Sequence, residues 1–143
     1  MEKQMPSGND LFSAEEVFAF ELEGAVVRGK IDLIRNGNNN FKEIVDFKTT
    51  RSNTSSIEQY DHQMDIYALG AEKGLNLNIS DRSLYFLEDN EPQTIDWDEG
   101  KRKTAESNLS SWIQKIKNQE FEPRIEFCPF CNEFKEICPY FKK

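Results

Sequence analysis

The chain has 143 residues, of which 31% are charged and 12% aromatic, and its 26 acidic and 18 basic residues give a net charge of −8. The length fits about one domain with a single core, and the acidic excess argues against a module that grips nucleic acid by charge alone. No apolar run approaches the ~20 residues of a membrane span and the polar start MEKQMPSGND lacks a signal-peptide pattern, so we expect a cytoplasmic protein.

Three strands are expected in the first third of the chain. The segment EVFAFEL (16–22) alternates in polarity, and a Glu-Gly turn leads into a second strand over 25–34. The loop RNGNNN (35–40) separates that strand from a third, FKEIVDFK (41–48). Because the connections are short, these strands predict an antiparallel meander.

A helix is expected after the third strand. Ser55 and Glu58 have the spacing of a capping box, Gly74 follows a plausible helix end, and apolar residues at helical spacing predict a stripe that faces the sheet. Two more strands are predicted at 82–87 and 92–97.

A second helix is expected from a cap at Asp98 to about Gln119. Its predicted apolar face comprises Leu109, Trp112, Ile113 and Ile116. Together the elements predict an α/β fold, a mixed central sheet flanked by helices, over residues 13–120. Residues 1–12 are expected to be a linker or disordered, and residues 121–143 form a cysteine-bearing tail.

Polar residues interrupt two strands that otherwise look buried. Asp46 and Lys48 share a face of the third strand, and Asp32 ends the apolar run of the second. Burying such groups without compensation costs several kcal/mol, so the two carboxylates are expected to converge on a hard cation, with the Phe47 carbonyl as a further ligand. The alternative is a partly exposed ion pair at a sheet edge, which would contribute little.

Lys48 has two expected roles beside such a cation. It either orients or deprotonates an attacking water, or it stabilises charge on a phosphate. Gln63 and Tyr67 lie four residues apart on one helix face and are expected to support Lys48, a water or a phosphate. Tyr67 also fits the helix core, and His62 is expected to be solvated.

These motifs resemble the RecB-like branch of the PD-(D/E)xK nucleases, with similarity to nucleases fused to UvrD/Rep-type helicases and to AddB-type iron-sulfur nucleases. The resemblance rests on Gly29-Lys30-Ile31-Asp32, Val45-Asp46-Phe47-Lys48-Thr49, Gln63 with Tyr67, and a late cysteine cluster. It implies a restriction-endonuclease-like core, metal ligands at Asp32 and Asp46, a catalytic Lys48, and a site completed by Gln63 and Tyr67. It also implies Mg²⁺ or Mn²⁺, a DNA substrate, and a helicase partner in repair or recombination.

The tail carries three thiols at Cys128, Cys131 and Cys138, a spacing that suits zinc or an iron-sulfur cluster. The resemblance implies a [4Fe-4S] cluster whose fourth cysteine lies far upstream, and this sequence has only three cysteines. We therefore expect the chain to be the carboxyl-terminal part of a longer protein. In this piece the thiols could hold zinc or stay empty.

The sequence thus predicts a metal-dependent deoxyribonuclease of exonuclease type. The main alternative is a nuclease-like domain that no longer cleaves DNA. It would serve as a DNA-binding module, or as an interaction module held together by a metal. A third possibility is that the tail acts as an independent zinc-binding element.

Overall fold

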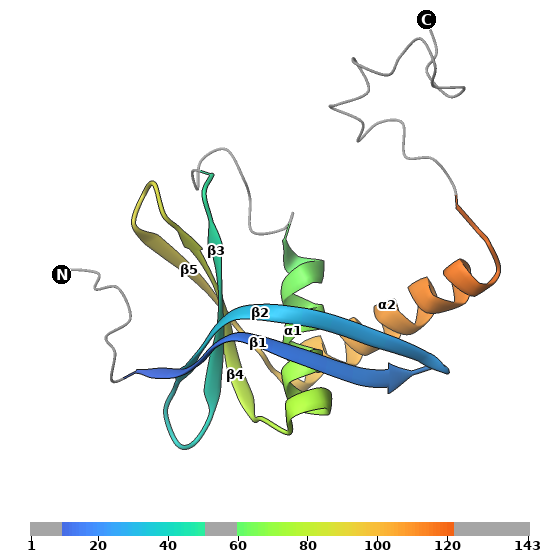
Figure 1. Ribbon diagram of the computed structural model, residues 1–143, viewed down its shortest axis with the longest axis horizontal. Helices are drawn as coiled ribbons and strands as arrows, with labels where there is room; N and C mark the ends of the chain where they lie inside the picture. The colour runs from blue at the N-terminus through green and yellow to red at the C-terminus, as the bar shows by residue number, and fades with distance from the viewer. Residues whose placement is uncertain (1–9, 51–59, 122–143) are drawn as a thin grey trace, which may run out of the picture.

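The protein is described by a computed structural model that covers residues 10–50 and 60–121. The predicted order of elements is confirmed, and only the bounds differ (Figure 1). The elements are β1 (Leu11–Leu22), β2 (Ala25–Asn36), β3 (Lys42–Lys48), α1 (Asp61–Leu75), β4 (Ile79–Phe86), β5 (Glu91–Asp96) and α2 (Glu99–Lys117).

The strands form one sheet in the order β1-β2-β3-β4-β5. The first three pair antiparallel, so the predicted meander is confirmed, whereas β3 and β4 are parallel and β5 returns antiparallel to β4. A parallel pair needs a long crossover connection, which the segment containing α1 supplies. The sheet is therefore mixed, and the predicted α/β class with a mixed central sheet is confirmed.

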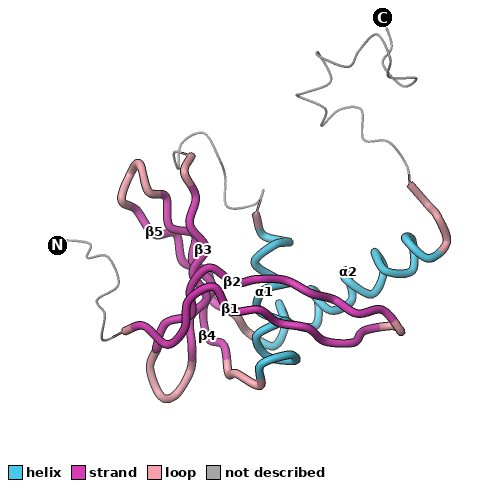
Figure 2. Tube along the Cα trace, in the orientation of Figure 1, coloured by secondary structure: helices cyan, strands magenta, loops and turns pink. Residues whose placement is uncertain are grey.

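The main hydrophobic core lies between the sheet and the two described helices (Figure 2). α1 contacts β1, β2, β3 and β4, and α2 packs against α1. A smaller cluster of Leu33, Val45 and Tyr85, joined by Phe47, gathers separately from that core. The alternation of side chains along β3 explains the division, because Ile44 belongs to the main core and its neighbour Val45 to the smaller cluster.

Close packing of β1, β2 and α1 depends on two glycines around Phe18. A Cβ atom at Gly29 or at Gly70 would lie 2.4 Å from the Phe18 ring. The fully buried ring therefore fits only because both neighbours lack side chains. This contact fixes the distance between the β1–β2 hairpin and the helix that carries Gln63 and Tyr67.

The ends of α1 differ from the sequence prediction. The helix begins at Asp61 with Tyr60 as its N-cap, and the expected capping box at Ser55 lies outside the described residues. At the other end Asn76, not the predicted Gly74, takes the left-handed conformation (φ 55°) and its N–H bonds to the Ala71 carbonyl. Asn tolerates this conformation almost as well as glycine, and the backbone of Ala19 lies where a Cβ of Gly74 would be.

The predicted cap of α2 is confirmed, since the Asp98 carboxylate accepts a hydrogen bond from the Lys101 N–H at 2.8 Å. Of the predicted apolar face, Leu109 and Ile113 are buried and Trp112 packs partly buried against the core, whereas Ile116 is 60% exposed. Ile116 belongs to the end of α2 that extends beyond α1 in Figure 1. Among the described residues, no helix is both long and apolar enough to cross a bilayer.

Candidate functional site

An irregularity in β2 places Asp32. Ile31 and Ile34 both reach the main core, although residues three apart in a regular strand point to opposite faces. Across from the break, Glu15 of β1 has a left-handed backbone (φ 54°), and the pairing of β2 with β3 starts only at Leu33, opposite Val45. One further step in that antiparallel register brings Asp32 opposite Asp46.

Asp32 holds the end of β3 through its side chain. Its Oδ2 accepts a hydrogen bond from the backbone N–H of Phe47 at 3.2 Å. This bond continues the attachment of β3 to β2 beyond the last backbone pair, and it fixes Asp32 beside the peptide that joins Asp46 to Phe47. The Phe47 ring packs edge-on against Tyr85 at 5.9 Å between centroids, away from the main core.

Asp46 is 3% exposed and lies opposite the buried Leu84. Burial raises the pKa of its carboxyl above the ordinary 3.8, the close contact with the charged Lys48 opposes that shift, and the charge of Asp32 adds to it. Asp46 Oδ2 lies 2.7 Å from Lys48 Nζ, yet this buried oxygen accepts no well-directed hydrogen bond from any described residue. The contact is therefore an ion pair, and Asp46 has an incompletely satisfied oxygen.

Lys48, Gln63 and Tyr67 form a directed chain of hydrogen bonds. Lys48 Nζ donates to Gln63 Oε1 at 2.8 Å, and Gln63 Nε2 donates to the Tyr67 hydroxyl at 3.0 Å. An ammonium group can only donate, so it determines which end of the amide faces it. The Tyr67 oxygen is thus an acceptor here, and its own proton cannot point at the Gln63 amide nitrogen.

Tyr67 contacts both the site and the hydrophobic core, and the sequence predicted each of these two positions. Its ring meets Phe18 edge-on at 6.1 Å, and burial raises the pKa of its hydroxyl, with Asp46 and Asp32 adding to the shift. Both carboxylates are therefore close enough to act on Tyr67. The predicted set of Asp32, Asp46, Lys48, Gln63 and Tyr67 is brought together in one place.

Sequence reasoning missed Tyr60. Lys48 Nζ lies 4.2 Å from the centroid of its ring, within the range of a cation–π contact. The only available signal was the i, i+3 spacing from Tyr60 to Gln63, which by itself is weak because Tyr60 precedes the first helical residue.

The carboxylates suit a divalent cation in their chemistry. Two aspartates and one lysine give the cluster a formal charge of −1, and the buried Asp46 carboxylate beside a second carboxylate is an environment that a hard cation would complete. In the described ranges no three His, Cys, Asp or Glu side chains converge. Backbone carbonyls and water would supply the remaining ligands, as is common for Mg²⁺.

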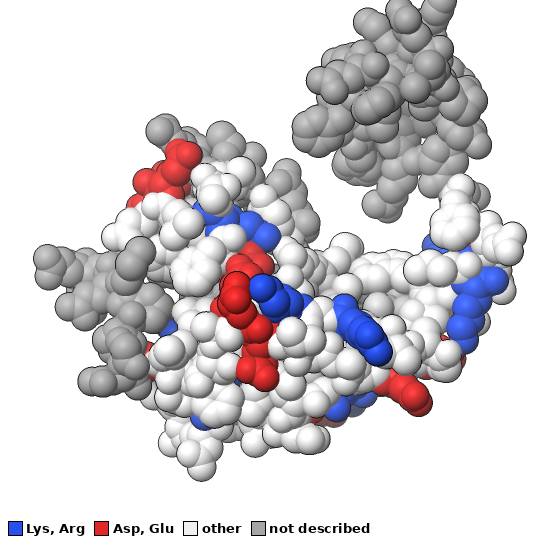
Figure 3. Space-filling view, in the orientation of Figure 1, with Lys and Arg blue, Asp and Glu red and all other residues white. Residues whose placement is uncertain are grey.

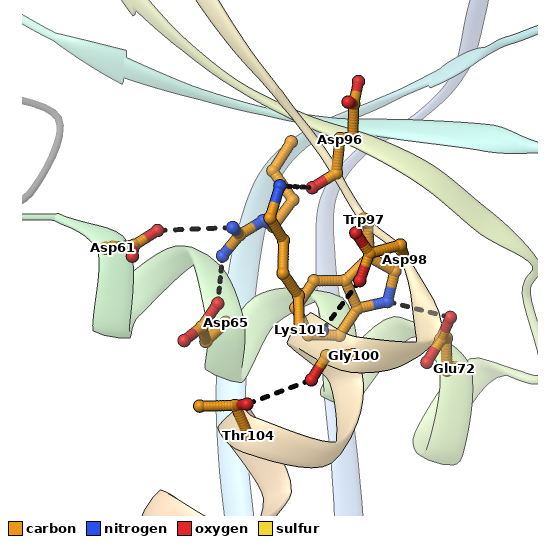
Figure 4. A network of polar contacts seen from close by, with 10 residues as sticks. Asp61, Asp65, Glu72, Asp96, Trp97, Asp98, Gly100, Lys101 and Thr104 are labelled. Atoms are coloured by element: carbon orange, nitrogen blue, oxygen red, sulfur yellow. Dashed lines mark hydrogen bonds and ion pairs between the residues drawn. The ribbon is translucent and has the colours of Figure 1, made fainter.

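An ion-pair network holds the first turns of α1 against β4 (Figure 4). Arg82 of β4 is 2% exposed; its guanidinium bonds to Asp65 and lies 3.2 Å from Asp61. These two aspartates flank Gln63 in the sequence. The Trp97 ring lies 4.9 Å from the same guanidinium, so Arg82 links α1, β4 and the segment before α2.

Other residues considered in the sequence have local partners. His62 is exposed as expected, and its ring meets Trp112 edge-on at 4.7 Å. Arg102 of α2 pairs with Glu72 of α1 at 2.6 Å, and this ion pair helps to attach the two helices to each other. Cys128, Cys131 and Cys138 lie outside the described residues, and the iron-sulfur or zinc site stays a prediction.

The comparisons with known proteins agree with this geometry. The family model of the PD-(D/E)XK nuclease superfamily matches residues 2–139. The crystal structure of SSO0001 is similar, with a TM-score of 0.60 and 18% identity over 92% of this chain and 62% of that one. The crystal structure of a candidate exonuclease from Eubacterium rectale is also similar, with a TM-score of 0.53 and 20% sequence identity. The match covers 85% of this chain and 51% of that one.

At these identities the two structures show a shared fold, and this chain spans about half to three fifths of their lengths. A search of curated proteins gives no significant match.

Proposed function

The chain belongs to the PD-(D/E)XK nuclease superfamily, and from that membership we propose that its site hydrolyses DNA phosphodiester bonds with the help of a divalent cation. The observation that carries the proposal is the meeting of Asp32, Asp46 and Lys48 at the junction of β2 and β3. An exposed ion pair would not need a second carboxylate beside it or an aspartate as buried as Asp46.

Asp32 and Asp46 are proposed to hold Mg²⁺ or Mn²⁺, together with the Phe47 carbonyl. When bound, such a cation supplies Lewis-acid chemistry: it polarises the phosphodiester and favours water as a nucleophile at neutral pH. The support is the donor set itself, because carboxylate and carbonyl oxygens are the ligands these hard cations prefer. The Phe47 N–H orients Asp32 for this task.

Lys48 is proposed to present a positive charge to the phosphate as negative charge develops there. Its geometry favours this role over that of a base, because its ammonium already faces a carboxylate and donates to an amide oxygen. Gln63 keeps the ammonium in position. Tyr67 orients Gln63 and directs its own hydroxyl proton to a phosphate oxygen or a water.

DNA is the proposed substrate, cleaved from an end, and the wider context is proposed to be a helicase-coupled enzyme of repair or recombination. The superfamily supports the nucleic-acid substrate. The sequence resemblance supports the exonuclease mode, and so does the fold shared with a candidate exonuclease. The resemblance alone supports the helicase partner and the iron-sulfur cluster.

The test is cleavage of end-labelled single- and double-stranded DNA by the chain in Mg²⁺ or Mn²⁺ and in EDTA. Asp46→Asn and Lys48→Ala should each lower the rate by more than about a hundredfold while the circular dichroism spectrum is unchanged. Asp96→Asn, at the exposed end of β5, and Lys42→Ala, at the other end of β3, are the matched controls. Cleavage that survives both site variants would refute the proposal, and DNA binding without cleavage would favour the inactive module.

A further inference from the structure

Tyr60 lies at the point where the chain enters α1, and its ring faces the proposed catalytic lysine. It is the N-cap residue of that helix and packs against the main core. The centroid of its ring lies 4.2 Å from Lys48 Nζ, so the ring contacts the charged end of Lys48. A cation over an aromatic face is attracted by the negative potential of the ring.

Lys48 therefore has three partners of different chemistry. Asp46 offers a carboxylate at 2.7 Å, Gln63 an amide oxygen at 2.8 Å, and Tyr60 the face of its ring. A lysine side chain has four rotatable bonds and loses considerable entropy when it is fixed. A single partner leaves the ammonium free to rotate about that contact, whereas three partners define its place.

We propose that Tyr60 is a positioning residue that holds the ammonium of Lys48 beside Asp46 through the face of its aromatic ring. The proposal rests on the proposed nuclease function for its catalytic consequence, but the contact itself can be tested without cleavage. Cation–π contacts strengthen when they are shielded from water, and the Lys48 side chain is only 15% exposed.

The chain contains a matched comparison. Lys42 Nζ lies 4.6 Å from the centroid of the Phe12 ring, and Phe12 is 47% exposed. This second contact lies at the opposite end of β3 from Lys48. Phe12→Leu should therefore leave the rate of cleavage unchanged, while Tyr60→Leu should reduce it.

The decisive experiment varies the ring electrostatics at constant shape. Tyr60→Phe should keep most of kcat, because the ring face is retained, and replacing that Phe with mono-, di- and trifluorinated phenylalanine should lower kcat stepwise with little change in KM. Tyr60→Leu should lie at the end of the series, about two- to thirtyfold below the wild type. A kcat that stays constant along the series, or a Leu variant equal to the Phe variant, would overturn the proposal.

A measurement on the resting protein separates this proposal from the proposed function. The ring current of Tyr60 should shift the NMR signals of the Lys48 ε-methylene protons upfield, and Tyr60→Leu should remove that shift while Phe12→Leu leaves it in place. Signals at the usual lysine position in the wild type would refute the contact. If the upfield shift is present in a chain that cleaves no DNA, the contact stands and the proposed function fails.

Discussion

Asp46 is buried on the side of β3 that faces the main core, beside a lysine and a second carboxylate. Its desolvation is the largest cause of its raised pKa, and it exceeds the opposing effect of Lys48. A carboxyl whose pKa is higher in the folded than in the unfolded state binds protons more tightly when folded. Ionisation of Asp46, which the proposed metal site needs, therefore lowers the free energy of unfolding of the metal-free protein.

We predict that Asp46→Asn raises the melting temperature at pH 7 in EDTA. Below pH 3.8 both states of the wild type are protonated and the benefit should vanish, and it should grow as the pH rises through the raised pKa of the folded state. Thermal melts from pH 3 to 7, followed by circular dichroism, measure the difference. A variant that is less stable than the wild type at pH 7 would contradict this account.

Asp98 provides the control of opposite sign. The Lys101 N–H lowers the pKa of this exposed cap, so its contribution to stability is present above its unfolded pKa and is lost as the pH falls through the folded value. Asp98→Asn should accordingly lower stability slightly at pH 7. The two Asp-to-Asn substitutions should therefore move the melting temperature in opposite directions.

Gln63 connects Lys48 with Tyr67: its amide oxygen accepts a hydrogen bond from Lys48, and its amide nitrogen donates one to Tyr67. We predict that Gln63→Leu lowers kcat by about ten- to a hundredfold, the range typical of residues that orient a catalytic group. Gln63→Glu keeps an acceptor for Lys48 but can no longer donate to Tyr67, so it should recover part of the loss. Steady-state kinetics decide the order, and equal losses in both variants would show that the bond to Lys48 has no separate effect.

Sequence reasoning found the members of the site that follow from local periodicity. Strand alternation put Asp46 and Lys48 on one face, and helix spacing put Gln63 with Tyr67. Tyr60 was not predicted as a member of the site, because its contact with Lys48 depends on how the chain enters α1, which no periodic pattern encodes. The break in β2 at Asp32 escaped for the same reason, since it depends on pairing with both neighbouring strands.

α1 carries both supporting residues of the site, and its position depends on contacts at its two faces. Gly70 admits the Phe18 ring on the hairpin side, and Arg82 binds Asp61 and Asp65 on the β4 side. The Nε atom of Arg82 is buried, and no described residue accepts a hydrogen bond from it. Such a group is costly unless its charge is paired, so the aspartates of α1 and the arginine of β4 depend on one another.

We predict that Asp65→Ala destabilises the protein by about 3–5 kcal/mol, because it removes the principal partner of a buried arginine. Urea unfolding monitored by circular dichroism measures the change. Glu106→Ala is the matched control: it removes an α2 carboxylate paired with Lys73 of α1, and these two side chains are 40% and 36% exposed, so the loss there should be within about 1 kcal/mol. Equal losses in the two variants would show that burial of Arg82 adds nothing.

The predicted helices and strands were correct where a long periodic pattern determined them. The predicted boundaries were wrong where packing against other elements determines where a helix ends. The α2 cap at Asp98 needed only its own hydrogen bond to Lys101 and was confirmed. The end of α1 moved from Gly74 to Asn76 because β1 needs the space that a side chain at 74 would fill. Ile116 has the right spacing for a core position, but it lies in the end of α2 that extends past α1.

On the scale of the whole molecule, more than half of the cations in the described ranges are paired with carboxylates. Figure 3 shows acidic and basic side chains next to one another on the visible face, without a broad basic surface. Within the described residues, the cations in ion pairs are Lys30, Arg35, Lys48, Lys73, Arg82, Arg102 and Lys103. The net charge of the chain is −8, and the described ranges offer little basic surface with which to bind many phosphates.

We therefore predict that this chain binds single-stranded DNA with a shallow salt dependence and needs a divalent cation to bind well. Two or three phosphate contacts give a slope of log K against log salt of about −2, and a cation held by Asp32 and Asp46 would offset the local negative charge. Fluorescence anisotropy of a labelled oligonucleotide with the Lys48→Ala variant, in Mg²⁺ or EDTA at equal ionic strength, measures both effects. Adding Asp46→Asn should abolish the response to Mg²⁺, and a slope steeper than about −4 would point to a basic surface in a part of the chain beyond the described residues.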